Sequence, residues 1–291
     1  PQEYSKGYYF VLGLADRTGE LELKYWGGDR KAAVKKVYEQ IEEGDVIHVK
    51  GEVSTYRNRE EIELDEEKGY IKKAEEYDIE DFVPKVDKDL EDLVEKFKEE
   101  VKEMEDEGYR RVMESIIEDK ELFEKLKKAP AAMYYHHAYI GGLLEHILSL
   151  IEIVKNIKKI HPELDLDLMK AGCVLHDIGK VEEFDVTTNL KQSEKGLLRG
   201  HISIGEEILS RKLDGLEVDE IKENKLHHIV ISHHGDKEFG AAKTPSFPEA
   251  AAVHHADQLD TQVFQHIDIR ENADTDDFHK YDKRFDQIYL K

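Results

Sequence analysis

An apolar run ends in a histidine and an aspartate at Ala171-Gly172-Cys173-Val174-Leu175-His176-Asp177-Ile178-Gly179-Lys180. Segment 166–175 carries an apolar stripe of helical period, which predicts that the His-Asp pair stands at the end of a helix. An imidazole and a carboxylate at that place supply one nitrogen ligand and one carboxylate able to bridge two metal ions. The stretch therefore predicts a metal site inside a helical protein.

Further histidines and one aspartate surround this pair along the chain. His146 lies in a helical segment, His201 follows a glycine, and His233-His234 follow a serine. Imidazole and carboxylate suit divalent ions such as Mn²⁺, Fe²⁺, Co²⁺ or Zn²⁺, and ligands on separate helices of a bundle can converge on one interior point. The candidate ligands are His146, His176, Asp177, His201, His233, His234 and Asp257.

The periodicity of the chain changes near residue 87. Beyond it, apolar residues recur at three- and four-residue spacing, beginning with Leu90, Leu93, Val94 and Phe97, so the remainder is predicted to be helical. Helices are expected at 109–118, 120–127, 138–160, 166–175, 202–211, 218–232 and 248–266. Before residue 84, the β-rich segments 8–14, 21–26 and 46–53, with a short helix at 31–42, predict a small barrel.

Composition narrows the class of protein. The 291 residues include 43 Lys+Arg and 66 Asp+Glu, a formal charge of −23, which argues against a protein that coats DNA. Lys and Glu predominate, as in proteins of hot environments, and a high-salt interior fits equally well. The single cysteine, Cys173, fits a reducing cytoplasm. We find no apolar run long enough for a membrane span and no signal peptide, so a cytoplasmic location is expected.

The ligand order resembles that of the HD superfamily of metal-dependent phosphohydrolases over residues 130–270. The resemblance implies a first ion held by His146, His176, Asp177 and Asp257. It implies a second ion that shares Asp177 and adds His201, His233 and His234. Asp177 and Lys180 are the expected catalytic residues, with Lys180 facing a phosphate oxygen. Glu145, Glu249 or Asp260 are expected to orient ligand histidines. His136 and His137 are candidate substrate contacts, although packing or capping is the favoured role for both.

The first 83 residues resemble an OB-fold domain of the anticodon-binding type. The resemblance rests on the segment 10–19 followed by Trp26, and on Gly44-Asp45-Val46 and segment 49–53. Such barrels bind single strands by stacking bases on aromatic side chains along a positive groove. The expected nucleic-acid contacts are Tyr25, Trp26, Lys50, Tyr56, Arg57 and Arg59. Residues 1–83 nevertheless carry 13 Lys+Arg and 21 Asp+Glu, a balance of −8.

Both halves together resemble the YhaM-like 3′→5′ exoribonucleases. This implies an α+β multidomain chain: an OB-like barrel at 1–83, a helical connector at 84–129, an all-α HD bundle at 130–270 and a tail at 271–291. The resemblance further implies hydrolysis of single-stranded RNA to nucleoside 5′-monophosphates, with single-stranded DNA as a second candidate substrate. Two divalent ions are expected, with Mn²⁺ the first candidate metal.

Two other functions stay open on the sequence alone. One is an HD phosphodiesterase or nucleotidase that acts on cyclic dinucleotides or free nucleotides. The other is a non-catalytic single-strand-binding module with a structural metal. The sequence also leaves the oligomeric state open, a homo-oligomer included.

Overall fold

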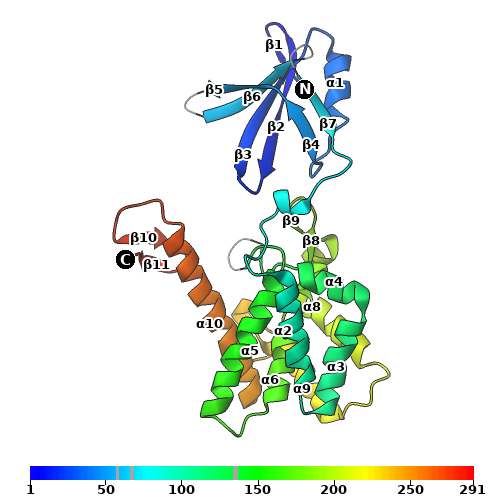
Figure 1. Ribbon diagram of the computed structural model, residues 1–291, viewed down its shortest axis with the longest axis vertical. Coiled ribbons are helices and arrows are strands. Elements are labelled where there is room, and N and C mark those ends of the chain that lie inside the picture. The colour runs from blue at the N-terminus through cyan, green and yellow to red at the C-terminus, as the bar shows by residue number, and fades with distance from the viewer. Residues whose placement is uncertain (57–58, 66–68, 134–136) are drawn as a thin grey trace. The chain divides into compact units, whose positions relative to one another are not determined.

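The computed structural model describes residues 1–56, 59–65, 69–133 and 137–291. The chain divides into two compact units. The first comprises residues 1–84 together with 187–189, and the second comprises 85–186 and 190–291. Figure 1 traces the chain through both units.

The first unit consists mainly of strands. A five-stranded sheet has the order β1-β2-β3-β6-β5, and β4 pairs with β7. Strand β3 runs antiparallel to β2 and parallel to β6. The elements are β1 (Gln2–Tyr4), β2 (Gly7–Asp16), β3 (Gly19–Trp26), α1 (Lys31–Tyr38), β4 (Ile47–Lys50), β5 (Glu52–Tyr56), β6 (Arg59–Asp65), β7 (Tyr70–Lys73) and a 3-10 turn at Ile79–Asp81.

Inward-facing and outward-facing side chains alternate along these strands, and the inward-facing ones form the small core of the first unit. Because successive side chains of a strand point to opposite faces, Leu23 and Tyr25 face inward while Lys24 and Trp26 lie on the other face. The core contains Phe10, Leu23, Tyr25, Val34 and Leu64. Helix α1 packs closely against the strands, since a Cβ at Gly27 would lie 2.1 Å from Cγ2 of Val34.

The second unit is a helical bundle with two small hairpins. Its helices are α2 (Leu90–Lys102), α3 (Glu107–Glu118), α4 (Lys120–Lys128), α5 (Gly142–Ile160), α6 (Leu166–Leu175), α7 (Lys180–Glu183), α8 (Glu194–Leu213), α9 (Glu220–Ser232) and α10 (Pro248–Glu271), with a 3-10 turn, η2, at Lys237–Phe239. The hairpins are β8 (Phe184–Val186) with β9 (Leu190–Gln192) and β10 (His279–Asp282) with β11 (Asp286–Tyr289).

The bundle is organised around its most apolar helices. Helices α5, α6 and α10 pack on one another, and Figure 1 shows them side by side in green and orange. Every residue of α6 from Leu168 to Leu175 is buried, as expected for a helix surrounded by others. Aspartates cap several helices and satisfy their first backbone N–H groups; the capping side chains are Asp89, Asp106, Asp119, Asp165 and Asp219.

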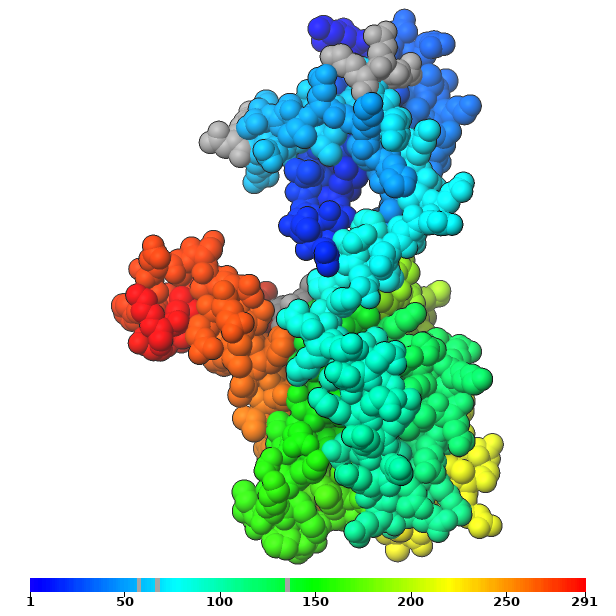
Figure 2. All heavy atoms as spheres, in the orientation of Figure 1, coloured from blue at the N-terminus to red at the C-terminus, as the bar shows by residue number. Residues whose placement is uncertain are grey.

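Several predicted boundaries differ from the observed ones: α1 ends at Tyr38 instead of residue 42, and α10 continues to Glu271 instead of residue 266. Helix α5 begins at Gly142 instead of residue 138, because Gly141 takes a left-handed conformation with φ of 84°. Helix α8 begins at Glu194 instead of residue 202, since Ser193 caps it and the chain continues through a kink at Gly200. The segment expected as a tail forms β10 and β11, which pack against the last turns of α10 through contacts such as Arg284 with Gln265, and Figure 2 shows these red residues beside the orange ones.

In the part of the chain that the structure describes, no helix is both long and apolar enough to cross a lipid bilayer. The Cys173 thiol is buried in α6.

Candidate metal centre

His176 and Asp177 directly follow α6, as the sequence predicts. The Nδ1 of His176 donates to the carbonyl of Cys173 at 2.8 Å, so this hydrogen bond fixes the ring and presents Nε2 as the ligand atom. That Nε2 lies 3.2 Å from Oδ2 of Asp177. Both side chains are buried. The end of α6 therefore delivers one nitrogen and one carboxylate to the interior of the bundle.

His146 reaches the same region from α5. Its Nε2 lies 3.2 Å from Oδ1 of Asp257, and its Nδ1 donates to Oδ2 of Asp260 at 2.7 Å. Both aspartates belong to α10, one turn apart. Because Asp260 occupies Nδ1, the ring of His146 turns Nε2 toward Asp257.

A second set of imidazoles comes from α8 and from the end of α9. The Nε2 atoms of His201 and His234 lie 3.3 Å apart. His233 and His234 donate their Nδ1 protons to backbone carbonyls, at Val230 (2.8 Å) and Phe239 (2.7 Å). Each ring is thus oriented from behind and presents its other nitrogen.

Asp177 stands between the two sets. Its Oδ2 faces His176, while its Oδ1 lies 3.4 Å from Nε2 of His201 and 3.6 Å from Nε2 of His233. Within each trio, ligand atoms lie within 4.8 Å of one another, both for His146, His176 and Asp177 and for His201, His233 and His234. The structure therefore brings together all the residues predicted as ligands, on five helices and their ends.

The donor set fits a divalent cation. Among the described residues, the buried Nε2 atoms of His176 and His233 and the buried Oδ1 of Asp177 have no hydrogen-bond partner. Buried polar atoms of this kind are costly unless something outside the chain satisfies them. A divalent ion that binds imidazole nitrogen and carboxylate oxygen would satisfy all of them.

The electrostatics agree with a cation site. Burial raises the pKa of Asp177, but the nearby Lys180 and His176 outweigh it and hold this pKa well below its usual range. Burial keeps the pKa of His233 well below its usual range and lowers that of His234. The carboxylate is therefore charged and these imidazoles are neutral, the states in which both bind metal. Burial lowers the pKa of His146, yet Asp257 and Asp260 raise it to about 9, so a bound cation would replace a proton there.

Lys180 lies one turn after Asp177 and is buried. Its Nζ donates to Oδ2 of Asp177 and to the carbonyl of Ala131, both at 2.5 Å. Lys180 therefore fixes and neutralises one oxygen of Asp177. The resemblance implies that this ammonium also faces a phosphate oxygen, and that role stays a prediction.

The three residues expected to orient ligand histidines differ in whether they contact one. Asp260 holds His146. Glu145 is bonded to Tyr139 and to Lys88, beside His137, and these contacts lower its pKa to about 2 against the opposing effect of burial. Glu249 accepts from the backbone N–H of Asp165 and, among the contacts of the described residues, meets no candidate ligand. The expectation for Glu249 is therefore wrong, because it caps a neighbouring helix.

His137 is buried and contacts Asp260 and Tyr139. It therefore supports Asp260 from behind instead of facing solvent, which agrees with the favoured packing role and not with a substrate contact. His136 lies outside the described residues.

Sequence reasoning missed residues that position ligands. Glu183 accepts from the backbone N–H of His201 and lies 3.3 Å from its Nδ1. His254 Nδ1 donates to the carbonyl of His233 at 2.5 Å. The doublet His254-His255 on the helix of Asp257 was a usable signal for the second contact. Nothing in the sequence marks Glu183, because its place depends on the close approach of α7 to α8.

The candidate nucleic-acid contacts lie in the first unit. Tyr25 is 4% exposed and stacks on Phe10 at 4.8 Å, so its expected stacking on a base is wrong because the core covers its ring. Trp26 is half-buried and stacks on Tyr9 at 5.2 Å. Lys50, Tyr56 and Arg59 are exposed. Arg57 lies outside the described residues.

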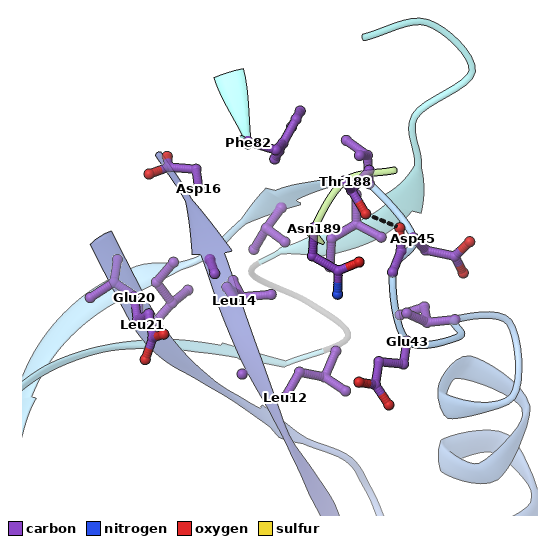
Figure 3. Close-up of a pocket in the computed structure, with 18 of the residues that line it drawn as sticks. Leu12, Leu14, Asp16, Glu20, Leu21, Glu43, Asp45, Phe82, Thr188 and Asn189 are labelled. Carbon is purple, nitrogen blue, oxygen red and sulfur yellow. Dashed lines mark hydrogen bonds between the residues drawn. The ribbon is translucent and has the colours of Figure 1, made fainter. Parts of the chain in front are cut away.

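Two hollows of the first unit differ in their suitability for a polyanion. One, of about 1200 Å³, is lined by Lys24, Tyr56 and Arg59 as well as by glutamates, and Lys24 lies 4.9 Å over the Tyr56 ring. The other, of about 840 Å³, combines leucines such as Leu12 and Leu14 with acidic side chains. Figure 3 shows Asp16, Glu20, Glu43 and Asp45 around it. Carboxylates repel phosphates, and the first hollow also has four of them, with Lys24 paired to Glu61 at 2.5 Å. It is the better candidate only because Lys24 and Arg59 belong to its lining, whereas the lining of the second hollow includes no lysine or arginine among the described residues.

Comparisons with known proteins agree with both halves. Residues 143–262 match the HD domain model, and residues 2–71 match a model of OB-fold nucleic acid binding domains. The predicted fold class, an OB-like barrel followed by a helical HD bundle, is thereby confirmed. No solved structure is significantly similar to the chain.

Curated relatives cover most of the chain. The 3′-5′ exoribonuclease YhaM of Bacillus subtilis (strain 168) is 30% identical over 255 residues, which cover 88% of this chain and 79% of that protein. The protein of the same name from Bacillus velezensis is 31% identical, and that from Listeria welshimeri is 30% identical, with the same coverage.

Proposed function

The chain belongs to the family of the 3′-5′ exoribonuclease YhaM, and from this premise we infer that it is a metal-dependent 3′→5′ exonuclease. We propose single-stranded RNA as its substrate and nucleoside 5′-monophosphates as its products. The observation that carries the proposal is the position of Asp177, whose two oxygens face separate groups of imidazoles. One carboxylate between two nitrogen sets suits a pair of ions.

The proposed ligand sets follow from these contacts. His146, His176 and Asp257 would hold one ion with Asp177, and His201, His233 and His234 would hold the other with its second oxygen. Mn²⁺ is the proposed metal because the resemblance to the YhaM-like family implies it, while Fe²⁺, Co²⁺ or Zn²⁺ would also suit a donor set of imidazoles and carboxylates. When bound, two such ions lower the pKa of a water and stabilise charge on the attacking and leaving oxygens of a phosphodiester.

The protein's own groups prepare this chemistry in three ways. Backbone carbonyls behind His176, His233 and His234 fix which nitrogen each ring presents. Lys180 keeps Asp177 ionised within the bundle. Burial excludes bulk water from the ligand atoms, which strengthens the electrostatic interactions there.

For the first unit we propose a role in holding the single strand. The exposed Tyr56 and Arg59 line one hollow with Lys24, which suits stacking combined with phosphate contact. Lys50 and the half-buried Trp26 are further proposed contacts. These residues supply aromatic surface and individual cations in a unit that is acidic as a whole, and glutamates, among them the partner of Lys24, lie beside them in the same hollow.

Degradation of end-labelled RNA tests the proposal. A 5′-labelled single-stranded RNA is incubated with Mn²⁺ and sampled over time, and the released products are identified by chromatography against 5′- and 3′-monophosphates. The expected result is a ladder that shortens from the 3′ end and releases 5′-monophosphates. A matched DNA strand in parallel measures the preference for RNA.

Intact RNA under these conditions would contradict the proposal. Turnover of a cyclic dinucleotide or a free nucleotide by the same preparation would then assign the site to small substrates. RNA binding without turnover of any of them would leave a single-strand-binding module.

A further inference from the structure

An exposed phenylalanine lies directly behind one of the proposed metal ligands. The carbonyl of Phe239 accepts from Nδ1 of His234 at 2.7 Å, while the side chain of Phe239 is 65% exposed. Phe239 closes η2, the short turn that follows the His233-His234 pair. The same residue therefore orients a ligand histidine through its backbone and carries an exposed aromatic side chain on the turn that supports that histidine.

The backbone of this turn is fixed against the metal centre. The backbone N–H of Phe239 donates to the backbone carbonyl of Asp236 at 3.0 Å, and the N–H of Gly240 donates to the backbone carbonyl of Lys237 at 3.1 Å. Gly240 takes a left-handed conformation with φ of 96°, and a Cβ there would lie 3.7 Å from Nδ1 of His234. The Phe239 Cα is thus held at a set distance from His234.

The ring of Phe239 serves no packing purpose that the structure reveals. It belongs to neither hydrophobic core cluster, and no aromatic pair or cation–π contact found among the described residues includes it. Single exposed apolar side chains are common on protein surfaces, and what sets Phe239 apart is its backbone contact with a proposed ligand.

We infer that Phe239 is a stacking subsite for the base of the 3′-terminal nucleotide; this rests on the proposed exonuclease function. If the scissile phosphate lies at the ions, the base of the departing nucleotide lies one sugar away, within the region of the turn behind His234. A phenyl ring has no hydrogen-bonding group, so it holds any base by its π-face. An exonuclease that removes every nucleotide in turn needs contact of this kind.

The first test removes the base from the substrate. Two 5′-labelled RNAs are compared that differ only in the 3′-terminal residue, which carries its base in one and ribose alone in the other. Single-turnover removal of that residue is measured for wild type, Phe239→Ala, Phe239→Tyr and Ile221→Ala. Ile221 is a matched exposed apolar control, 67% exposed and about 18 Å along α9 from His233.

A stacking contact predicts a specific pattern. Phe239→Ala lowers kcat/KM on the normal RNA by about 5-fold to 150-fold and leaves the rate on the baseless RNA within about two-fold of wild type. Phe239→Tyr and Ile221→Ala retain the wild-type rate on both substrates. Equal losses on both RNAs would show that the ring only supports His234, and no loss on either would show that it contacts nothing.

A second test reads the contact without turnover. An RNA with 3′-terminal 2-aminopurine is bound to Asp177→Ala protein in Mg²⁺, and its fluorescence is recorded. Stacking predicts quenching that disappears in the Asp177→Ala/Phe239→Ala double variant at saturating protein. Undiminished quenching would overturn the inference. If wild type shortens normal and baseless RNA at equal rates, the inference alone fails; if wild type shortens neither, the proposed function fails too.

Discussion

Asp260 Oδ2 accepts a hydrogen bond from Nδ1 of His146 at 2.7 Å. Both residues reach the bundle interior from different helices, α10 and α5, and His146 meets Asp257 through its other nitrogen. This relationship sets the orientation of one imidazole before any cation binds. His146 is thus a residue that would contact the metal, whereas Asp260 only orients this ligand.

Asp260→Asn is expected to weaken metal binding without removing a ligand. Loss of the carboxylate partner lowers the basicity of the imidazole, which typically costs 10-fold to 100-fold in metal affinity. Calorimetric titration with Mn²⁺ measures the effect. Asp268→Asn, an exposed position two turns further along α10, is the matched control and should retain wild-type affinity. Unchanged affinity in Asp260→Asn would contradict the positioning role.

His234→Ala is expected to change the number of ions bound. The three-histidine set loses one of its nitrogens, while His146, His176, Asp177 and Asp257 stay intact. The Mn²⁺ content measured after equilibrium dialysis should be one ion per chain in the variant and two in wild type. Two ions in the variant, or one in wild type, would refute the two-ion arrangement.

The role of Tyr25 in the core predicts a loss of stability. Its ring packs on Phe10 in the centre of the first unit, and truncation of a buried aromatic ring typically costs about 3–5 kcal/mol. Urea denaturation of Tyr25→Ala should show this loss in the transition of the first unit. Tyr56→Ala should leave that transition unchanged and weaken RNA binding. The opposite pattern would mean that the two faces of the sheet are assigned the wrong way round.

A buried charge network predicts a pH-dependent effect on unfolding. Glu100 on α2 contacts Lys155 and the buried Lys170, each at 2.7 Å. Glu100→Gln leaves the buried Lys170 ammonium with only the more distant Glu103 carboxylate at 3.9 Å, and loss of the close partner of a buried charge typically costs up to about 3–5 kcal/mol. Glu95→Gln, which removes the partner of the exposed Lys98, is the control and should cost less than about 1 kcal/mol.

The pH dependence follows from the direction of the shift. Burial raises the pKa of Glu100, but hydrogen bonds from Lys155 and Lys170 lower it below its usual value. The stabilisation is therefore present above the unfolded-state pKa and is lost as the pH falls through the folded-state pKa. Urea titrations from pH 7 to pH 3 should show that the difference in unfolding free energy between wild type and Glu100→Gln becomes smaller as the pH falls. A difference in unfolding free energy that grows at acidic pH would contradict the lowered pKa of Glu100.

The sequence predicted much of the site because metal ligands are chemically distinctive. His146, His176, Asp177 and the later histidines stand out by type and order, and helices bring them together. Residues that act through the backbone were invisible, because any residue carries the carbonyl that Phe239 offers to His234. Tyr25 was misassigned for another reason: which of Tyr25 and Trp26 faces the core depends on strand register, and aromatic character alone does not distinguish them.

The dependence of RNA degradation on Mn²⁺ tests the central claim most directly. Wild type and Asp177→Asn are stripped with a chelator and dialysed, and the shortening of 5′-labelled RNA is then measured across a Mn²⁺ titration. We predict that stripped wild type is inactive and recovers with Mn²⁺, whereas Asp177→Asn stays inactive at every concentration while keeping its fold by circular dichroism. Full activity in the stripped wild type, or recovery of Asp177→Asn to the wild-type rate, would contradict the account.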